Sequence, residues 1–182
     1  MKKIFFLPVI LTVIFSFWGC EKDESVDPRP LLVQGQFMRL DIVRDRIDAE
    51  NLETSSFGGM LTNPSNDVVK YELFVRLVRG DVGISEYIPL DTITSFPQEL
   101  AIGAQDVEDA YAAIGTTVVV QEGDVFRFIA YSYNSQGVRV AYRDLSTTVR
   151  SEPGYKQAYK FNTSVQAGNN LLTEYSNYEP AP

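Results

Sequence analysis

Residues 69–79 read VKYELFVRLVR, and hydrophobic and polar side chains alternate along most of this run. One side of an extended chain then carries four hydrophobic residues, Tyr71, Leu73, Val75 and Leu77. A period of two residues is typical of a β-strand with one side in the core. The run therefore predicts a long, half-buried strand.

The same period recurs in residues 125–133 and 138–142. In these two runs we expect six inward-facing residues: Phe126, Phe128, Ala130, Val138, Val140 and Tyr142. Residues 134–137 lie between the runs and have the composition of a hairpin turn, as do residues 121–124. We also expect strands at residues 33–44, 55–62, 86–93, 116–120 and 157–165.

Residues 104–114 follow a different pattern, with hydrophobic side chains at helical spacing, acidic residues in the first half, and Gly115 beyond the end as a C-cap. One short helix crossing between many strands indicates an all-β domain. We expect an antiparallel immunoglobulin-like β-sandwich at residues 33–165, with one short crossover helix. An irregular C-terminal tail is expected at residues 166–182, whose composition is rich in Asn, Gly, Tyr and Pro.

Composition excludes several classes of function. The chain has 182 residues, a formal charge of −8, no His and one Cys. Zinc sites and disulfides need more than one Cys or a Cys/His set. Nucleic acid is bound through clustered Lys and Arg, so we expect no nucleic-acid partner. The length allows one domain, or at most two small ones.

The first twenty residues differ in character from the rest. Met1-Lys2-Lys3 supplies positive charge, residues 4–18 are mostly apolar, and charged residues follow Cys20. This order is the layout of a secretory signal, and its apolar part is shorter than the ~20 residues of a spanning helix. The end of the apolar part, Phe17-Trp18-Gly19-Cys20, resembles the lipobox of bacterial lipoproteins. We expect a signal peptide at residues 1–19 and lipid attachment at Cys20.

The residues after Cys20 read as a flexible acidic tether, residues 20–32. Its first four residues after the cysteine are Glu21, Lys22, Asp23 and Glu24. This cluster resembles the export signal that Bacteroidetes use to place lipoproteins on the cell surface. We therefore expect a lipid-anchored outer-membrane protein that faces outward. Removal of residues 1–19 would take away Lys2 and Lys3 and change the formal charge from −8 to −10, which repels anionic lipid.

Four segments carry a further resemblance. They are residues 69–78, residues 94–97 with Leu100, residues 123–128, and residues 153–161. Their spacing resembles small Bacteroidetes lipoproteins associated with SusC/SusD-type uptake systems. The resemblance implies a surface-exposed, immunoglobulin-like accessory subunit that works with an outer-membrane barrel complex and binds a glycan or peptide. A structural subunit of an outer-membrane assembly or secretion machine, without a small ligand, remains the alternative.

Candidate chemistry is limited. Acidic residues cluster at residues 41–50 and 106–109, but no pair has the setting of catalytic carboxylates, so we expect no enzyme and no catalytic residue. We also expect no metal and no cofactor, because neither cluster has the spacing of a calcium loop. Tyr131 and Tyr133 lie opposite the predicted core residues and are candidates for stacking against a ligand or partner. Asp91-Thr92-Ile93 resembles a Bacteroidetes O-glycosylation acceptor, with Thr92 modified.

Overall fold

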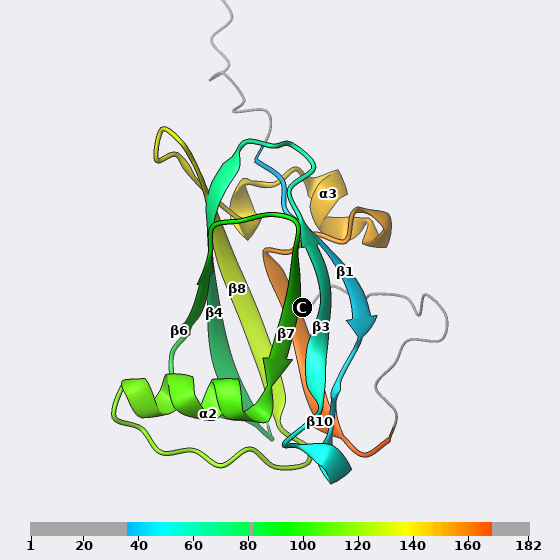
Figure 1. Ribbon diagram of the computed structural model, residues 1–182, viewed down its shortest axis with the longest axis vertical. Helices are drawn as coiled ribbons and strands as arrows, with labels where there is room; N and C mark the ends of the chain where they lie inside the picture. The colour runs from blue at the N-terminus through cyan, green and yellow to red at the C-terminus, as the bar shows by residue number, and fades with distance from the viewer. Residues whose placement is uncertain (1–35, 81, 169–182) are drawn as a thin grey trace, which may run out of the picture. The chain divides into compact units, whose positions relative to one another are not determined.

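The computed structural model of the chain describes residues 36–80 and 82–168 (Figure 1). Most of them form two β-sheets. The smaller sheet has the order β1 (Arg39–Arg44), β3 (Ser56–Thr62) and β7 (Gln98–Gly103). The larger sheet has the order β2 (Ile47–Asp48), β10 (Lys160–Gln166), β8 (Val125–Asn134), β4 (Val68–Arg79) and β5 (Val82–Gly83), with β6 (Ile88–Ile93) on β4 and β9 (Arg139–Ala141) on β8.

The strand pairings are antiparallel except that of β2 with β10, among the residues described. The all-β class predicted from the alternating pattern is therefore confirmed. Short helices connect the strands: α2 (Ala104–Ala113), α3 (Thr147–Ser151), and the 3-10 turns η2 (Ala49–Asn51), η3 (Tyr142–Asp144) and η4 (Pro153–Tyr155).

The two longest strands, β4 and β8, pair along their length and form the centre of the larger sheet. Leu73 lies opposite Ala130, and Val75 lies opposite Phe128. The residues predicted to face inward on these strands are at most 1% exposed: Tyr71, Leu73, Val75, Leu77, Phe126, Phe128 and Ala130. Period-two alternation therefore gave the correct inner side of both strands.

Three phenylalanine rings join the two sheets. Phe57 of β3 stacks at 5.8 Å on Phe128 of β8 and at 5.8 Å on Phe161 of β10, and the last two rings are 4.9 Å apart. All three side chains are essentially buried. Burial of one such side chain contributes about 1.5–3 kcal/mol. The sheets consequently pack face to face around a single core.

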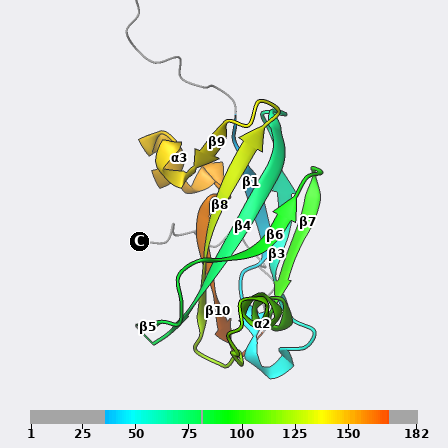
Figure 2. The same cartoon turned by 90° about the vertical axis from the view of Figure 1, so that its left-hand side faces the viewer.

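Helix α2 closes one end of this core (Figures 1 and 2). Its first turn is stabilised by Asp106, whose carboxylate accepts a hydrogen bond from Gly103 N at 2.7 Å. Val107 and Tyr111 are completely buried. The Tyr111 hydroxyl accepts a 2.9 Å hydrogen bond from Leu77 N of β4, so the helix is tied to the larger sheet.

The structure differs from the sequence-based expectation in several places. The strand predicted at residues 116–120 is absent from the described structure, because Val120 N donates to Glu108 Oε1 of α2 at 2.8 Å and holds this segment against the helix. Strand β7 was not predicted, and neither was α3. Within residues 36–80 and 82–168, none of the helices has the length and hydropathy to cross a membrane.

Candidate functional site

The outer side of the larger sheet, facing away from the core, carries both tyrosines singled out from the sequence. Cross-strand register places Tyr133 opposite Lys70, Tyr131 opposite Glu72, and Ile129 opposite Phe74. Residues opposite each other in a sheet share a side, and their Cβ atoms lie about 4.5–5.5 Å apart. We call this surface the tyrosine–arginine face; its residues are Lys70, Glu72, Phe74, Arg76, Arg127, Tyr131, Tyr133 and Arg139.

The ring of Tyr131 has two neighbours on this face. Phe74 meets it edge-on, with ring centroids 5.5 Å apart and an interplanar angle of 76°. The guanidinium carbon of Arg139 lies 4.8 Å from the ring centroid. A cation at this distance is attracted to the ring by about 0.5–1 kcal/mol at an exposed site. The Tyr131 ring therefore supports an arginine on one of its faces.

Tyr133 is held in the same way. Lys70 Nζ lies 4.0 Å from the ring centroid, and the Tyr133 hydroxyl donates a 2.7 Å hydrogen bond to Glu72. Lys70 also pairs with Glu72 at 2.8 Å. The hydrogen bonds from Lys70 and then Tyr133 lower the pKa of Glu72, while burial and then Glu72 raise the pKa of Tyr133. At neutral pH the face thus presents a charged Glu72 and an intact phenol.

Tyr142 repeats the arrangement outside the sheet. Sequence alternation predicted that it would face inward with Val140. Strand β9 ends at Ala141 and the chain turns into η3, and both Val140 and Tyr142 are partly buried against the core. Two cations lie near the Tyr142 ring, Arg150 at 5.8 Å and Lys160 at 5.5 Å from its centroid.

A hollow of about 220 Å³ opens between these tyrosines. It lies where β8 changes partner: the last β9 pair joins Tyr131 to Ala141, and the first β10 pair joins Ile129 to Lys160. Its lining consists of Ile129, Ala130, Tyr131, Arg139, Ala141, Tyr142, Arg143 and Tyr159. The irregular connection between β9 and β10 therefore leaves a small depression walled by aromatic rings and guanidinium groups.

Thr92 lies on the same side of the larger sheet. It is exposed on β6 and pairs with Glu72 of β4, which pairs in turn with Tyr131. Its neighbour Asp91 accepts a 2.7 Å hydrogen bond from Thr92 N. Glycosylation of Thr92 remains a prediction, and a glycan attached there would stand beside the tyrosine–arginine face.

The other predicted sites lie outside the described residues. They are the lipidation site Cys20, the export signal Glu21, Lys22, Asp23 and Glu24, and most of the C-terminal tail. Strand β10 reaches Gln166, and the described residues end at 168.

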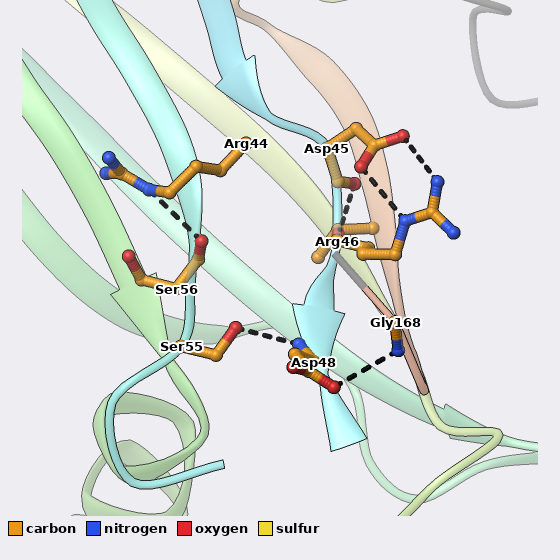
Figure 3. Close-up of polar contacts among 8 residues, drawn as sticks. Arg44, Asp45, Arg46, Asp48, Ser55, Ser56 and Gly168 are labelled. Atoms are coloured by element: carbon orange, nitrogen blue, oxygen red, sulfur yellow. Dashed lines mark hydrogen bonds and ion pairs between the residues drawn. The ribbon is translucent and has the colours of Figure 1, made fainter. Parts of the chain in front are cut away.

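The acidic cluster near the N-terminal strands is engaged in local contacts (Figure 3). Asp45 binds the guanidinium of Arg46 at 3.0 and 3.1 Å. Asp48 accepts hydrogen bonds from the Asn51 side chain at 2.7 Å, Glu50 N at 3.0 Å and Gly168 N at 3.2 Å, and these bonds lower its pKa. Over the described ranges, no group of three or more acidic, Cys or His side chains is arranged to hold a metal ion. Asp48 therefore stabilises the start of η2.

Sequence reasoning identified the tyrosines but missed the cations on their rings. The sequence did contain a sign of the Arg139 contact. A hairpin turn at residues 134–137 pairs Tyr133 with Arg139, which places the arginine next to the tyrosines of β8. Arg150 and Lys160 had none, since Arg150 lies in α3 and Lys160 begins β10, and both approach Tyr142 only through the irregular path of the chain between β9 and β10. No protein-family model, curated protein or solved structure matches this chain.

Proposed function

We propose that this protein is a non-enzymatic surface lipoprotein, anchored to the outer membrane through Cys20, and a binding or accessory subunit of an outer-membrane complex such as a SusC/SusD-type nutrient importer. The observation that carries the proposal is the composition of the tyrosine–arginine face. It presents half-buried tyrosine and phenylalanine side chains next to the exposed Arg127 and Arg139 on a sheet. These residue types are enriched at interfaces and among the residues that dominate binding energy.

The side chains on this face are held in place by their neighbours, which supports a binding role. The Tyr131 ring is fixed by Phe74 and Arg139, and the Tyr133 hydroxyl is fixed by Glu72. Side chains already held in place lose less conformational freedom on binding, which otherwise costs about 0.5–1.5 kcal/mol per immobilised side chain. We further propose that the two packed sheets form an immunoglobulin-like sandwich, a fold that can present one sheet to a partner while the other completes the core.

The second candidate is a structural subunit of an assembly or secretion machine with no small ligand. It is favoured by the cations on the tyrosine rings, because a ring face covered by Lys70 or Arg139 is less open to direct stacking. Such a face suits a protein partner whose carboxylates meet the cations.

Partner recovery from membranes tests the main proposal. The tagged full-length protein is solubilised in mild detergent, captured, and its companions identified by mass spectrometry. We expect an outer-membrane barrel protein to be recovered, and we expect Cys20→Ala to move the protein into the soluble fraction. The double variant Tyr131→Ala/Tyr133→Ala should lose the companion, while Tyr155→Ala, which removes a tyrosine that is 43% exposed elsewhere, should retain it. A wild-type protein recovered alone contradicts the proposal.

A further inference from the structure

Positive charge gathers around the hollow in an acidic protein. The whole chain carries −8, yet Arg139 and Arg143 line the hollow, and Arg150 and Lys160 flank the Tyr142 ring at its edge. Two acids lie near these cations. Glu72 interacts electrostatically with Arg139 but is paired with Lys70 at 2.8 Å, and Asp144 offsets little of the charge. Its carboxylate is 3.7 Å from Arg143, at an exposed site, and also accepts a 2.9 Å hydrogen bond from Ala141 N. The hollow is therefore a local site of positive potential.

The aromatic rings hold these cations in position. A guanidinium stacked on a ring keeps its N–H edge free, and that planar fork matches the oxygens of a carboxylate or sulfate. Arg139 lies over the Tyr131 ring, and Arg150, which also donates to Thr147 Oγ1 at 3.4 Å, lies over the Tyr142 ring. A ring with a cation over it offers less open surface to a neutral sugar.

A second positive site lies further along the same face. Arg76 and Arg127 are direct cross-strand partners. Like charges in this position repel each other and destabilise a sheet. Within residues 36–80 and 82–168, neither arginine forms an ion pair with an acidic side chain. Arg127 is four residues from Tyr131, about 14 Å at the rise of a strand. A ligand with repeated negative charges would contact both sites and relieve the repulsion.

The size of the hollow limits what can enter it. A volume of about 220 Å³ equals about seven water molecules at about 30 Å³ each. It is smaller than the pockets of about 300–1,000 Å³ that enclose drug-sized ligands. One ring-sized unit with an acidic substituent fits, and the rest of a longer ligand would lie along the sheet towards Arg127.

We propose that the tyrosine–arginine face and the adjoining hollow bind an acidic polysaccharide, with a carboxylate or sulfate of one sugar unit held by Arg139 and Arg143 in the hollow and a second acidic group held by Arg76 and Arg127. The inference rests on the proposed binding role of this face. An acidic peptide is the weaker occupant, because peptide interfaces depend on buried apolar anchors. The exposed large hydrophobic side chains of the described residues all lie outside the lining of the hollow.

Calorimetric titration of the full-length protein in detergent tests the inference. The acidic probes are oligogalacturonate and chondroitin sulfate oligosaccharides, and the neutral probe is a galacto-oligosaccharide of matched length. We expect at least one acidic probe to bind, with weaker binding at higher salt, and no binding of the neutral probe. Arg139→Gln/Arg143→Gln should weaken binding by about tenfold or more, since it removes the charge-assisted hydrogen bonds to the acidic group.

A matched control lies on the smaller sheet. Arg39→Gln/Arg44→Gln removes the same charge from β1, where the two arginines pair with Asp41 and Glu99, and should leave binding unchanged. Equal thermal unfolding midpoints would show that both double variants remain folded. If the control weakens binding as much as Arg139→Gln/Arg143→Gln, only net charge matters and the site is wrong.

Other outcomes separate this inference from the proposed function. Equal binding of the neutral and acidic probes overturns the requirement for negative charge. Tighter binding of poly-glutamate or of phosphatidylglycerol vesicles through the same arginines assigns the face to another occupant. If neither acidic probe binds but the outer-membrane partner is still recovered, the inference is rejected and the proposed function is unaffected. If neither acidic probe binds and no partner is recovered, both the inference and the proposed function are rejected.

Discussion

The carboxylate of Asp124 is completely buried and accepts two hydrogen bonds, each 2.8 Å long, from the guanidinium of Arg79. Arg79 is the last residue of β4, and Asp124 directly precedes β8. The same carboxylate also accepts a hydrogen bond from Gln121 N at 3.0 Å. Val165 N of β10 donates to the Asp124 carbonyl at 2.8 Å. This one contact therefore ties together three strands at the end of the larger sheet.

Removal of Arg79 should destabilise the protein strongly. Arg79→Ala leaves the buried Asp124 carboxylate without its counterion, which typically costs about 3–5 kcal/mol. The Arg79 side chain is 39% exposed, so solvent screens part of the interaction and we expect about 2–3 kcal/mol. Urea unfolding would measure the loss. The exposed pair Arg143–Asp144, 3.7 Å apart, gives the control: Arg143→Ala should cost less than about 0.5 kcal/mol. Equal losses would contradict the prediction.

Stability should fall in strongly alkaline solution because of Tyr159. Burial raises the pKa of Tyr159 to about 12, although its hydrogen bond with Ser132 acts in the opposite direction. Above pH 10 the unfolded chain loses this proton, whereas the folded protein keeps it until about pH 12. The folded state then binds more protons, so the free energy of unfolding decreases as pH rises, by about 3 kcal/mol in total over this range.

Urea unfolding at several pH values between 9 and about 12 would record this decrease. Tyr159→Phe should flatten the slope, while losing about 1–2 kcal/mol at neutral pH, because the phenol also donates to Gln36 O at 3.1 Å. Tyr155→Phe should keep the wild-type slope. A steep alkaline decrease that survives Tyr159→Phe would assign the effect to another group.

Gly58 should tolerate no side chain. Its φ is +155°, and a Cβ atom built there would lie 1.8 Å from the carbonyl oxygen of Leu100 on the paired strand β7. Gly58→Ala must displace backbone in the middle of the smaller sheet, and we expect a loss of about 3 kcal/mol or more. Gly154→Ala is the control, because nothing lies within 4 Å of its added Cβ. Thermal unfolding of the two variants gives the comparison, and a stable Gly58→Ala protein would count against the close strand approach.

The periodicity of hydrophobic residues predicted the strands and the helix that have one side in the core. Alternation identified β4 and β8 with the correct inner residues, and helical spacing identified α2 to within one residue at its end. Both signals arise because one side of each element lies in the core. Strand β7 has only Leu100 and Ile102 buried in six residues, and it is defined by pairing with β3, about 40 residues earlier in the chain. Such long-range pairing leaves little trace in a local window.

The candidate site was predictable to the same degree. Tyr131 and Tyr133 were placed on the outer side because their phase on β8 is opposite to that of Phe128. Stacking of the two rings against a ligand or partner stays a prediction. The structure adds Arg139 over the Tyr131 ring and Lys70 over the Tyr133 ring, and these contacts depend on the positions of β9 and β4 relative to β8. The sequence pattern assigns a side chain to a face, but the contacts on that face depend on the neighbouring strands.

A double-mutant cycle on Tyr131 and Arg139 would test whether the ring holds the arginine. The two groups lie 4.8 Å apart, so we expect a coupling of about 0.5–1 kcal/mol between Tyr131→Ala and Arg139→Ala in urea unfolding. The matched cycle pairs Arg139→Ala with Tyr155→Ala, whose ring lies against Phe37, and should give a coupling near zero. A Tyr131–Arg139 coupling as small as the control would mean that Arg139 moves freely in solution. The preordered guanidinium on which the acidic-polysaccharide site depends would then be absent, even if the face still bound a protein partner.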